Sequence, residues 1–361
     1  MVQHPKLSNF LNMTAMIVES YPEGKAFVTK TVEELLFKGF NLPFFDHLNT
    51  IFRELGWTPD EIEALWREVL PRDARDFRFA FYRDAVRNGT VDGPYLIGTG
   101  KEDPYDFGRI HLWHGESKHY MKPWSSEECN AINGTDGTLF PPLIHKETIL
   151  QTFVTDLCRS MSFRYEKDVE FGVILGYRFV LHPDSVASVK VRPENECFCV
   201  GKCLGAGLLD VSKCFDGKPI VMSSPHFLIP DGAGDNGLNK SLLDGIAPMK
   251  DSHETFLDVE PVNGTLLRVK KRLQTNIKVR QVDGYKAFAN LPEMEVPVFW
   301  TEESAELSQE ESKEQRRRPK PPKPPSGYGS TDEETPTWAI GVGVGVVVLV
   351  IILRCICKKL N

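Results

Sequence analysis

Alternation of apolar and polar residues is clearest over residues 265–280, directly after the pair Asn263-Gly264. Asn-Gly favours a two-residue hairpin turn, because both residues adopt positive φ at low cost. The period of two that follows predicts a long β-strand with one dry and one wet face. We interpret the dry face as core, with the lining of a lipid passage as the alternative. We expect the wet face to be solvated, with an anion-binding surface as the alternative. Its side chains are basic or amide: Arg268, Lys270, Arg272, Gln274, Asn276, Lys278 and Arg280.

Residues 1–90 are predicted to be mainly helical. Thr31 and Glu34 have the spacing of a capping box and predict a helix over 32–40. Thr58 and Glu61 repeat that spacing around Pro59, which favours the first turn of a second helix, ending near residue 70. This helix has four apolar residues on one face: Ile62, Leu65, Trp66 and Val69. From 91 to 301 the pattern indicates strands.

Residues 302–337 lose apolar content, being charged at first, then rich in proline, then rich in glycine and serine. This composition predicts a juxtamembrane linker. Residues 338–353 carry no charge, and extension to 357 provides about 30 Å of helix, enough to cross a bilayer. We therefore predict a transmembrane helix over 338–357 and a cytosolic tail over 358–361. A buried core helix is the alternative.

The flanks of this span indicate its orientation. Basic residues follow it and acidic residues precede it, so the positive-inside rule places residues 1–337 outside the cytosol. Cys355 and Cys357 would then lie at the cytosolic leaflet as candidates for palmitoylation, unmodified thiols being the alternative. Gly341 and Gly345 form a GxxxG pattern, which leaves homo-oligomerisation open.

The chain before the span contains glycosylation sequons and clustered cysteines. The five sequon asparagines are Asn12, Asn88, Asn133, Asn239 and Asn263. Outside the cytosol, disulfides are the default state of the six cysteines between 129 and 214. A zinc site is the rival interpretation, although the spacing is not that of paired CxxC motifs.

Charge and motifs exclude several classes of function. The net charge of −7 argues against a nucleic-acid partner, whose binding depends on Lys and Arg at phosphates. No GxSxG, HExxH or P-loop motif is present, so we predict neither an enzyme nor a cofactor or metal site. His111, His114 and His119 lie close together near Trp113, and we interpret them as solvated or core-edge residues, with pH sensing as the alternative.

Several longer blocks occur in the order typical of one receptor family. They are WSSEECNAINGTDGTLFPP (124–142), DLCRSM (156–161), YRFVL (177–181), ECFC (196–199), DVSKC (210–214), SSPHFL (223–228) and FLDVEPVNGTLLRVKKRLQTN (256–276). From about residue 10 to 301 the chain resembles the class B scavenger receptors. Members of that family have a span at each end, so the chain looks like a fragment or a truncated gene model without the first span and the early strands.

The resemblance implies an α+β fold, with a mostly antiparallel β-barrel core, incomplete here, and a helical apical cluster over 1–90. It implies a disulfide-bonded ectodomain over 91–301 with a lipid tunnel. It also implies that Cys129 pairs with Cys197, Cys158 with Cys214, and Cys199 with Cys203. A lysine near the second apical helix contacts acidic lipid in the family, and Lys25 is its nearest counterpart.

The function implied is a cell-surface receptor that binds lipoproteins, fatty acids or other lipids and passes lipid through the tunnel toward the membrane. The alternative is a trafficking or phagocytic receptor whose apical helices bind a protein or an apoptotic cell. Residence in the plasma membrane is expected, and the ending Lys358-Lys359-Leu-Asn allows an early secretory membrane. A lysosomal membrane is a further alternative.

Overall fold

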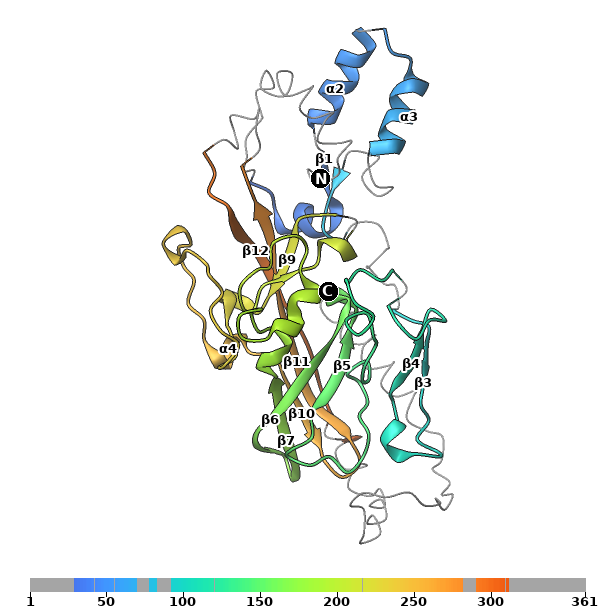
Figure 1. Cartoon of the computed structure of the whole chain (residues 1–361), viewed down its shortest axis with the longest axis vertical. Helices are drawn as coiled ribbons and strands as arrows, with labels where there is room; N and C mark the ends of the chain where they lie inside the picture. Colours follow the sequence, from blue (N-terminus) through green and yellow to red (C-terminus); the bar gives the residue numbers. More distant parts are fainter. Residues whose placement is uncertain are drawn as a thin grey trace. The chain divides into compact units, whose positions relative to one another are not determined.

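The computed structural model describes residues 29–311 apart from 42, 55, 70–77, 83–91, 120, 216, 282–289 and 309 (Figure 1). The chain divides into two compact units. The first comprises Met1–Asp92, Phe215–Ile220 and Ile277–Val296, and the second comprises Gly93–Cys214, Val221–Asn276 and Pro297–Asn361. Strands predominate over helices in the described residues, so the fold is mostly β with few helices.

The first unit holds the two longest helices among the described residues, α2 (Pro43–Glu54) and α3 (Pro59–Val69). They follow a single π-helical segment, η1 (Glu34–Lys38). Two short strands, β1 (Phe40–Asn41) and β2 (Arg78–Phe79), pair antiparallel in the same unit. The ring of Phe40 lies edge-on to that of Phe79, with 5.9 Å between the centroids, and this contact holds the pair together.

The first predicted helix is shorter than the sequence indicates. The Thr31 hydroxyl accepts a hydrogen bond from the Glu34 backbone N–H, and the Glu34 carboxylate accepts one from the Thr31 N–H, so the capping box is confirmed. The helical segment nevertheless ends at Lys38, because Gly39 has φ +74°. Phe40 then enters β1 and does not extend the helix to residue 40 as predicted.

The largest sheet, most of whose residues belong to the second unit, is antiparallel with the strand order β5-β6-β7-β10-β11-β9-β8, and β12 also pairs with β11. The strands are β5 (Leu150–Val154), β6 (Arg159–Phe171), β7 (Ile174–Leu181), β8 (Leu209–Asp210), β9 (Ile220–Ser223), β10 (Phe256–Glu260), β11 (Thr265–Val279) and β12 (Met294–Glu306). Figure 1 shows β6, β7, β10 and β11 side by side. No pairing among the described strands joins β5 to β8, so no closed barrel is observed in this part of the chain, and the incomplete barrel that the resemblance implies is not confirmed.

Smaller elements surround the sheet. β3 (Tyr95–Ile97) and β4 (Ile110–Trp113) form a separate antiparallel pair, and α4 (Lys250–His253) is a single turn. Short 3₁₀ segments connect the strands: Pro104–Asp106, Thr155–Leu157, Pro183–Ser185, Pro193–Phe198, Ser212–Cys214, Pro225–Phe227 and Lys240–Leu242. A core cluster of Ile110, Trp113, Ile132 and Phe153 packs on β4 and β5.

The predicted hairpin at Asn263-Gly264 and the long strand after it are both confirmed, as β10 and β11. Gly264 has φ +70°, and a Cβ there would lie 2.1 Å from the Phe140 carbonyl oxygen. The Glu260 carboxylate accepts hydrogen bonds from the backbone N–H groups of Val262 and Asn263. Glycine is therefore required both by the turn conformation and by the approach of a neighbouring backbone.

The prediction of a solvated basic face on β11 is wrong for its second half. Arg272, Gln274 and Asn276 are all buried, with exposed fractions of 4%, 3% and 0%. Arg272 donates to the carboxylate of Glu302 and to the carbonyl oxygens of Asp251 and Glu254. These partners replace water, and burial of polar groups is tolerated because each is hydrogen-bonded.

The predicted linker begins too early in the chain, because β12 continues to Glu306. Glu302 lies 3.3 Å from the Lys270 Nζ and 2.8 Å from the Arg272 Nε. The acidic composition that suggested a linker therefore comes from partners of the basic strand. Among the described residues no helix is long and apolar enough to cross a membrane, and the predicted span over 338–357 lies outside them.

A row of charges crosses three neighbouring strands of the sheet. Asp258 on β10 lies opposite Arg178 on β7 and opposite Arg268 on β11 in the strand register. Arg178 donates two hydrogen bonds to the Asp258 carboxylate, at 2.7 and 2.8 Å, and Arg268 donates through Nε at 2.9 Å. The Asp258 side chain is 1% exposed, so its charge depends on these two arginines.

The three clustered histidines differ in their surroundings. His111 is exposed and lies 2.8 Å from Asp106, whereas His119 is buried in the core cluster, edge-on to Trp113 with 5.0 Å between ring centroids. The His119 Nδ1 accepts a hydrogen bond from the Met121 backbone N–H. Burial lowers the pKa of His119 from 6.5 to about 4.

We expect His119 to make folding sensitive to acid. Because its pKa is lower in the folded state, its contribution is fully present above about pH 6.5 and is lost as pH falls toward 4. The loss at pH 4 should be about 3 kcal/mol. It is measured as the difference in pH-dependence of the free energy of unfolding between the wild type and His119→Gln, with the exposed His145→Gln as control. An equal pH-dependence in wild type and His119→Gln would contradict this expectation.

Candidate ligand-binding site

The site begins with the packing of α2 against α3. Phe45, Leu48 and Phe52 recur at the spacing of one helix face and are buried. Trp66 on α3 lies edge-on to Phe45, with 5.2 Å between centroids, and its indole N–H donates to the Asn49 side chain at 2.7 Å. The aromatic contact and the hydrogen bond together fix the two helices against each other.

The start of α3 follows the capping signal in the sequence. The Thr58 backbone N–H donates to the Glu61 carboxylate at 2.8 Å, and the Thr58 hydroxyl accepts from the Glu61 N–H. The hydrogen bond from the Thr58 backbone, together with one from its hydroxyl, lowers the pKa of Glu61. Of the predicted apolar face, Ile62 and Trp66 are buried, and Leu65 is partly buried.

A groove of about 330 Å³ runs along this helix pair. Ile62, Trp66 and Pro59 supply its apolar wall, and Glu63 and Arg67, which pair one helical turn apart, supply part of its polar rim. Asn49 and Arg53 of α2 complete the lining. An apolar wall with a charged rim suits a ligand that is itself partly apolar and partly charged.

The helix pair has an acidic surface. Residues 43–69 contain two arginines and six carboxylates, which gives a net charge of −4. Glu54 and Glu63 are both exposed. The local field therefore favours cationic ligands over polyanions.

Several predicted site residues lie outside the described residues, namely Lys25, Asn12, Asn88, Cys355 and Cys357. The three described sequon asparagines differ in exposure. Asn239 is exposed in a loop, whereas Asn133 and Asn263 are partly buried. The Asn263 side-chain amide also donates to the Glu260 carboxylate at 3.1 Å. Asn239 is thus the most accessible of the three for glycosylation, which stays a prediction.

The six central cysteines form three disulfides. Cys129 is joined to Cys197, Cys158 to Cys214, and Cys199 to Cys203, the same pairs that the resemblance implies. This pairing leaves no thiol among the six to bind zinc. Within the described ranges no group of three or more His, Cys, Asp or Glu side chains could hold a metal ion.

Sequence reasoning missed α2 and the groove. The signals of α2 were present in the sequence: proline at the first helical position and three apolar residues at i, i+3 and i+7. For the groove, the signal was the i, i+4 ion pair between Glu63 and Arg67 on α3. The sequence did not reveal that the two helices pack against each other, because this packing depends on the contacts of Trp66 with α2.

Comparison with known proteins identifies relatives over most of the chain. Residues 1–323 match the model of the CD36 family. Lysosome membrane protein 2 of Homo sapiens is 34% identical over 288 residues, which are 79% of this chain and 53% of the relative. Scavenger receptor class B member 1 of Mus musculus is 32% identical over 286 residues, covering 78% of this chain and 50% of the relative. Sensory neuron membrane protein 2 of Drosophila melanogaster is 32% identical over 256 residues, covering 66% and 45%. The chain spans about half the length of the curated relatives it matches.

Proposed function

The chain belongs to the CD36 family, and from this premise we propose that it is part of a membrane receptor for lipids, fatty acids or lipoproteins. Family membership is the observation that carries the proposal, and the relatives named above are membrane proteins or a scavenger receptor by name. Three disulfides support an oxidising compartment, so the ectodomain is placed in a lumen or outside the cell. The apolar run over 338–353 and its basic flank support a C-terminal anchor.

We further propose that lipid moves through the interior of a complete β-barrel in the full-length receptor. The antiparallel sheet from β5 to β12 supports this proposal as one wall of such a barrel. Passage through protein would avoid exposure of hydrocarbon to water, which costs about 0.8 kcal/mol for each methylene. Ligand would first contact the helical region, where Lys25 stays a proposed partner for acidic lipid.

Lipid binding is tested by titrating the purified full chain in lipid nanodiscs with a fluorescent fatty acid. Saturable binding that unlabelled oleate competes away is expected. Empty nanodiscs and the chain heated to unfolding serve as controls, since membrane partitioning alone increases linearly with fatty acid. A purely linear signal, identical with and without the chain, would refute the lipid proposal.

The acidic helix pair favours a second candidate function, a receptor that binds a cationic protein partner through α2 and α3. The groove beside Trp66 supplies an apolar anchor point, and its charged lining is Glu63 together with Arg53 and Arg67. The negative charge that would attract a cationic partner belongs to the helix pair as a whole, whose exposed acids include Glu54 and Glu63. Apolar contact at the centre with charge at the rim is typical of transient protein interfaces.

This second function predicts that reversing two exposed acidic residues of the helix pair weakens binding of a basic probe protein such as cytochrome c. Glu54→Lys with Glu63→Lys should reduce affinity on the order of tenfold at low salt, and the difference should shrink as salt screens the charges. The matched control is Glu147→Lys with Glu170→Lys, two exposed acids of the second unit. Equal weakening by both pairs would show a general charge effect and exclude this site, while the fatty acid titration reports on lipid binding separately.

A further inference from the structure

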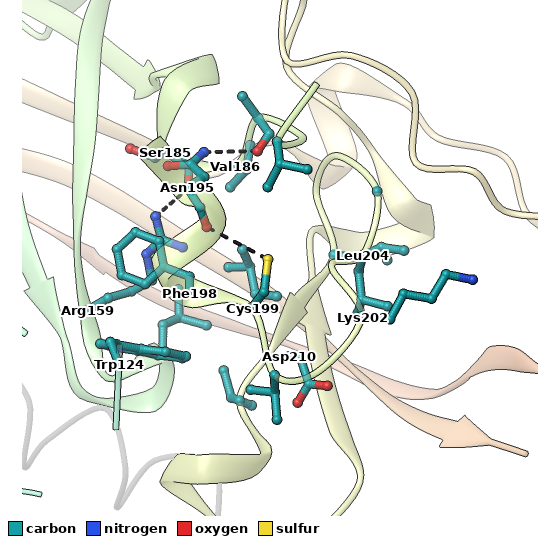
Figure 2. Close-up of a pocket in the computed structure, with 18 residues that line it drawn as sticks. Trp124, Arg159, Ser185, Val186, Asn195, Phe198, Cys199, Lys202, Leu204 and Asp210 are labelled. Carbon is teal, nitrogen blue, oxygen red and sulfur yellow. Dashed lines mark hydrogen bonds between the residues drawn. The ribbon is translucent and has the colours of Figure 1, made fainter. Parts of the chain in front are cut away.

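A small cavity lies in the second unit beneath the loop closed by Cys199 and Cys203, and Figure 2 shows the residues around it. Its volume is about 40 Å³. The walls are mostly apolar, with Leu208, Val211 and Val186 among them. Arg159, the first residue of β6, also lines the cavity.

Arg159 carries a buried charge without an anionic partner. Its exposed fraction is 5%, and one terminal nitrogen donates to the Ser185 carbonyl oxygen at 2.8 Å. The guanidinium carbon lies 3.4 Å from the centroid of the Phe198 ring. The Nε atom is buried and has no hydrogen-bond partner, and no carboxylate of the described residues forms an ion pair with this side chain.

Other polar groups at the cavity already have hydrogen-bond partners. Asp210 turns its carboxylate to the backbone N–H and hydroxyl of Ser212, at 3.0 and 2.6 Å. The Trp124 indole N–H donates to the Cys158 carbonyl oxygen. The Lys202 side chain extends away from Arg159 (Figure 2). Burial without a counter-ion lowers the pKa of Arg159 to about 9, which reflects how poorly the site solvates the charge.

We propose that this cavity is a binding site for a small monoanion, a halide ion or the carboxylate of a very short acid, held by the Arg159 guanidinium. One negative charge would compensate the one buried positive charge and satisfy its free Nε–H. Size selects among anions: a water molecule needs about 10–15 Å³ of such volume, so the cavity accommodates an ion of a few heavy atoms and excludes an acyl chain. The proposal does not rest on the receptor function proposed above.

The test compares thermal unfolding of the purified full chain in sodium chloride, formate, octanoate and methanesulfonate at equal ionic strength. Chloride and formate are expected to raise the Tm saturably by about 2–4 °C over methanesulfonate. Arg159→Gln should lose this difference, while Arg164→Gln, on the same strand, should keep it. Because Arg159→Gln also changes the hydrogen bond to the Ser185 carbonyl oxygen, a second measurement does not depend on the variant. Bromide is soaked into crystals of the wild type, with an anomalous peak expected beside Arg159.

Two results would overturn the proposal. Equal Tm values in chloride, formate and methanesulfonate, with no bromide peak, would mean that the cavity holds water only. If the Tm rises in octanoate alone, and this rise depends on Arg159, the cavity receives the head of a lipid and the proposal of a small-ion site is wrong.

Discussion

Replacing Asp258 with asparagine is expected to lower the free energy of unfolding by about 3 kcal/mol. The change keeps the shape of the side chain but removes the charge that compensates Arg178 and Arg268, whose side chains are 17% and 30% exposed. Both guanidiniums would then lie near each other without the carboxylate between them. In the wild type the hydrogen bond with Asp258 raises the pKa of Arg178, so the variant loses a partner that favours the charged form. Arginine side chains stay protonated in proteins, so the variant cannot relieve the repulsion by losing a proton.

Urea unfolding followed by fluorescence measures this loss. Asp168→Asn is the matched control, because Asp168 pairs with Lys146 but its side chain is 63% exposed. A surface pair of this kind contributes about 0–1 kcal/mol, so the control should remain close to the wild type. Similar losses in the two variants would contradict the role assigned to the buried row.

Removing the Cys158–Cys214 disulfide by the double change Cys158→Ser and Cys214→Ser is expected to cost about 4 kcal/mol. The two cysteines are 56 residues apart, so the reduced chain regains the entropy of a large loop on unfolding. Both residues are also buried, with exposed fractions of 3% and 9%. The Cys158 carbonyl oxygen accepts a hydrogen bond from the Trp124 indole N–H. Serine would place hydroxyls where the sulfur atoms now pack.

The Cys199–Cys203 bridge provides the internal comparison, since its separation is only 4 residues. Its removal should cost about 2 kcal/mol on the same entropic argument. Disulfide mapping under non-reducing conditions confirms which bridge is absent before unfolding is measured. Equal losses for the long and the short loop would refute the loop-length explanation.

Sequence signals were most reliable where a structure depends on neighbouring residues. The two capping boxes form as predicted, because a threonine and a glutamate three residues apart can reach each other whatever surrounds them. The end of the first helical segment was missed although Gly39 marks it, because the apolar residues around Gly39 suggested that the helix continued. The family itself was recognisable because many cysteine-bearing blocks occur in one order, and the family match confirms it.

By itself the sequence determined the turn at Asn263-Gly264, the long strand after it, the start of α3 and membership of the CD36 family. Only the tertiary structure decided that Arg272 and Asn276 are buried, that Asp258 lies between two arginines, and that Arg159 lines a cavity. The physical reason is distance along the chain. A turn or a cap is a contact over a few residues, whereas Arg178 and Asp258 are 80 residues apart, and alternation along one strand does not reveal which neighbour covers each face.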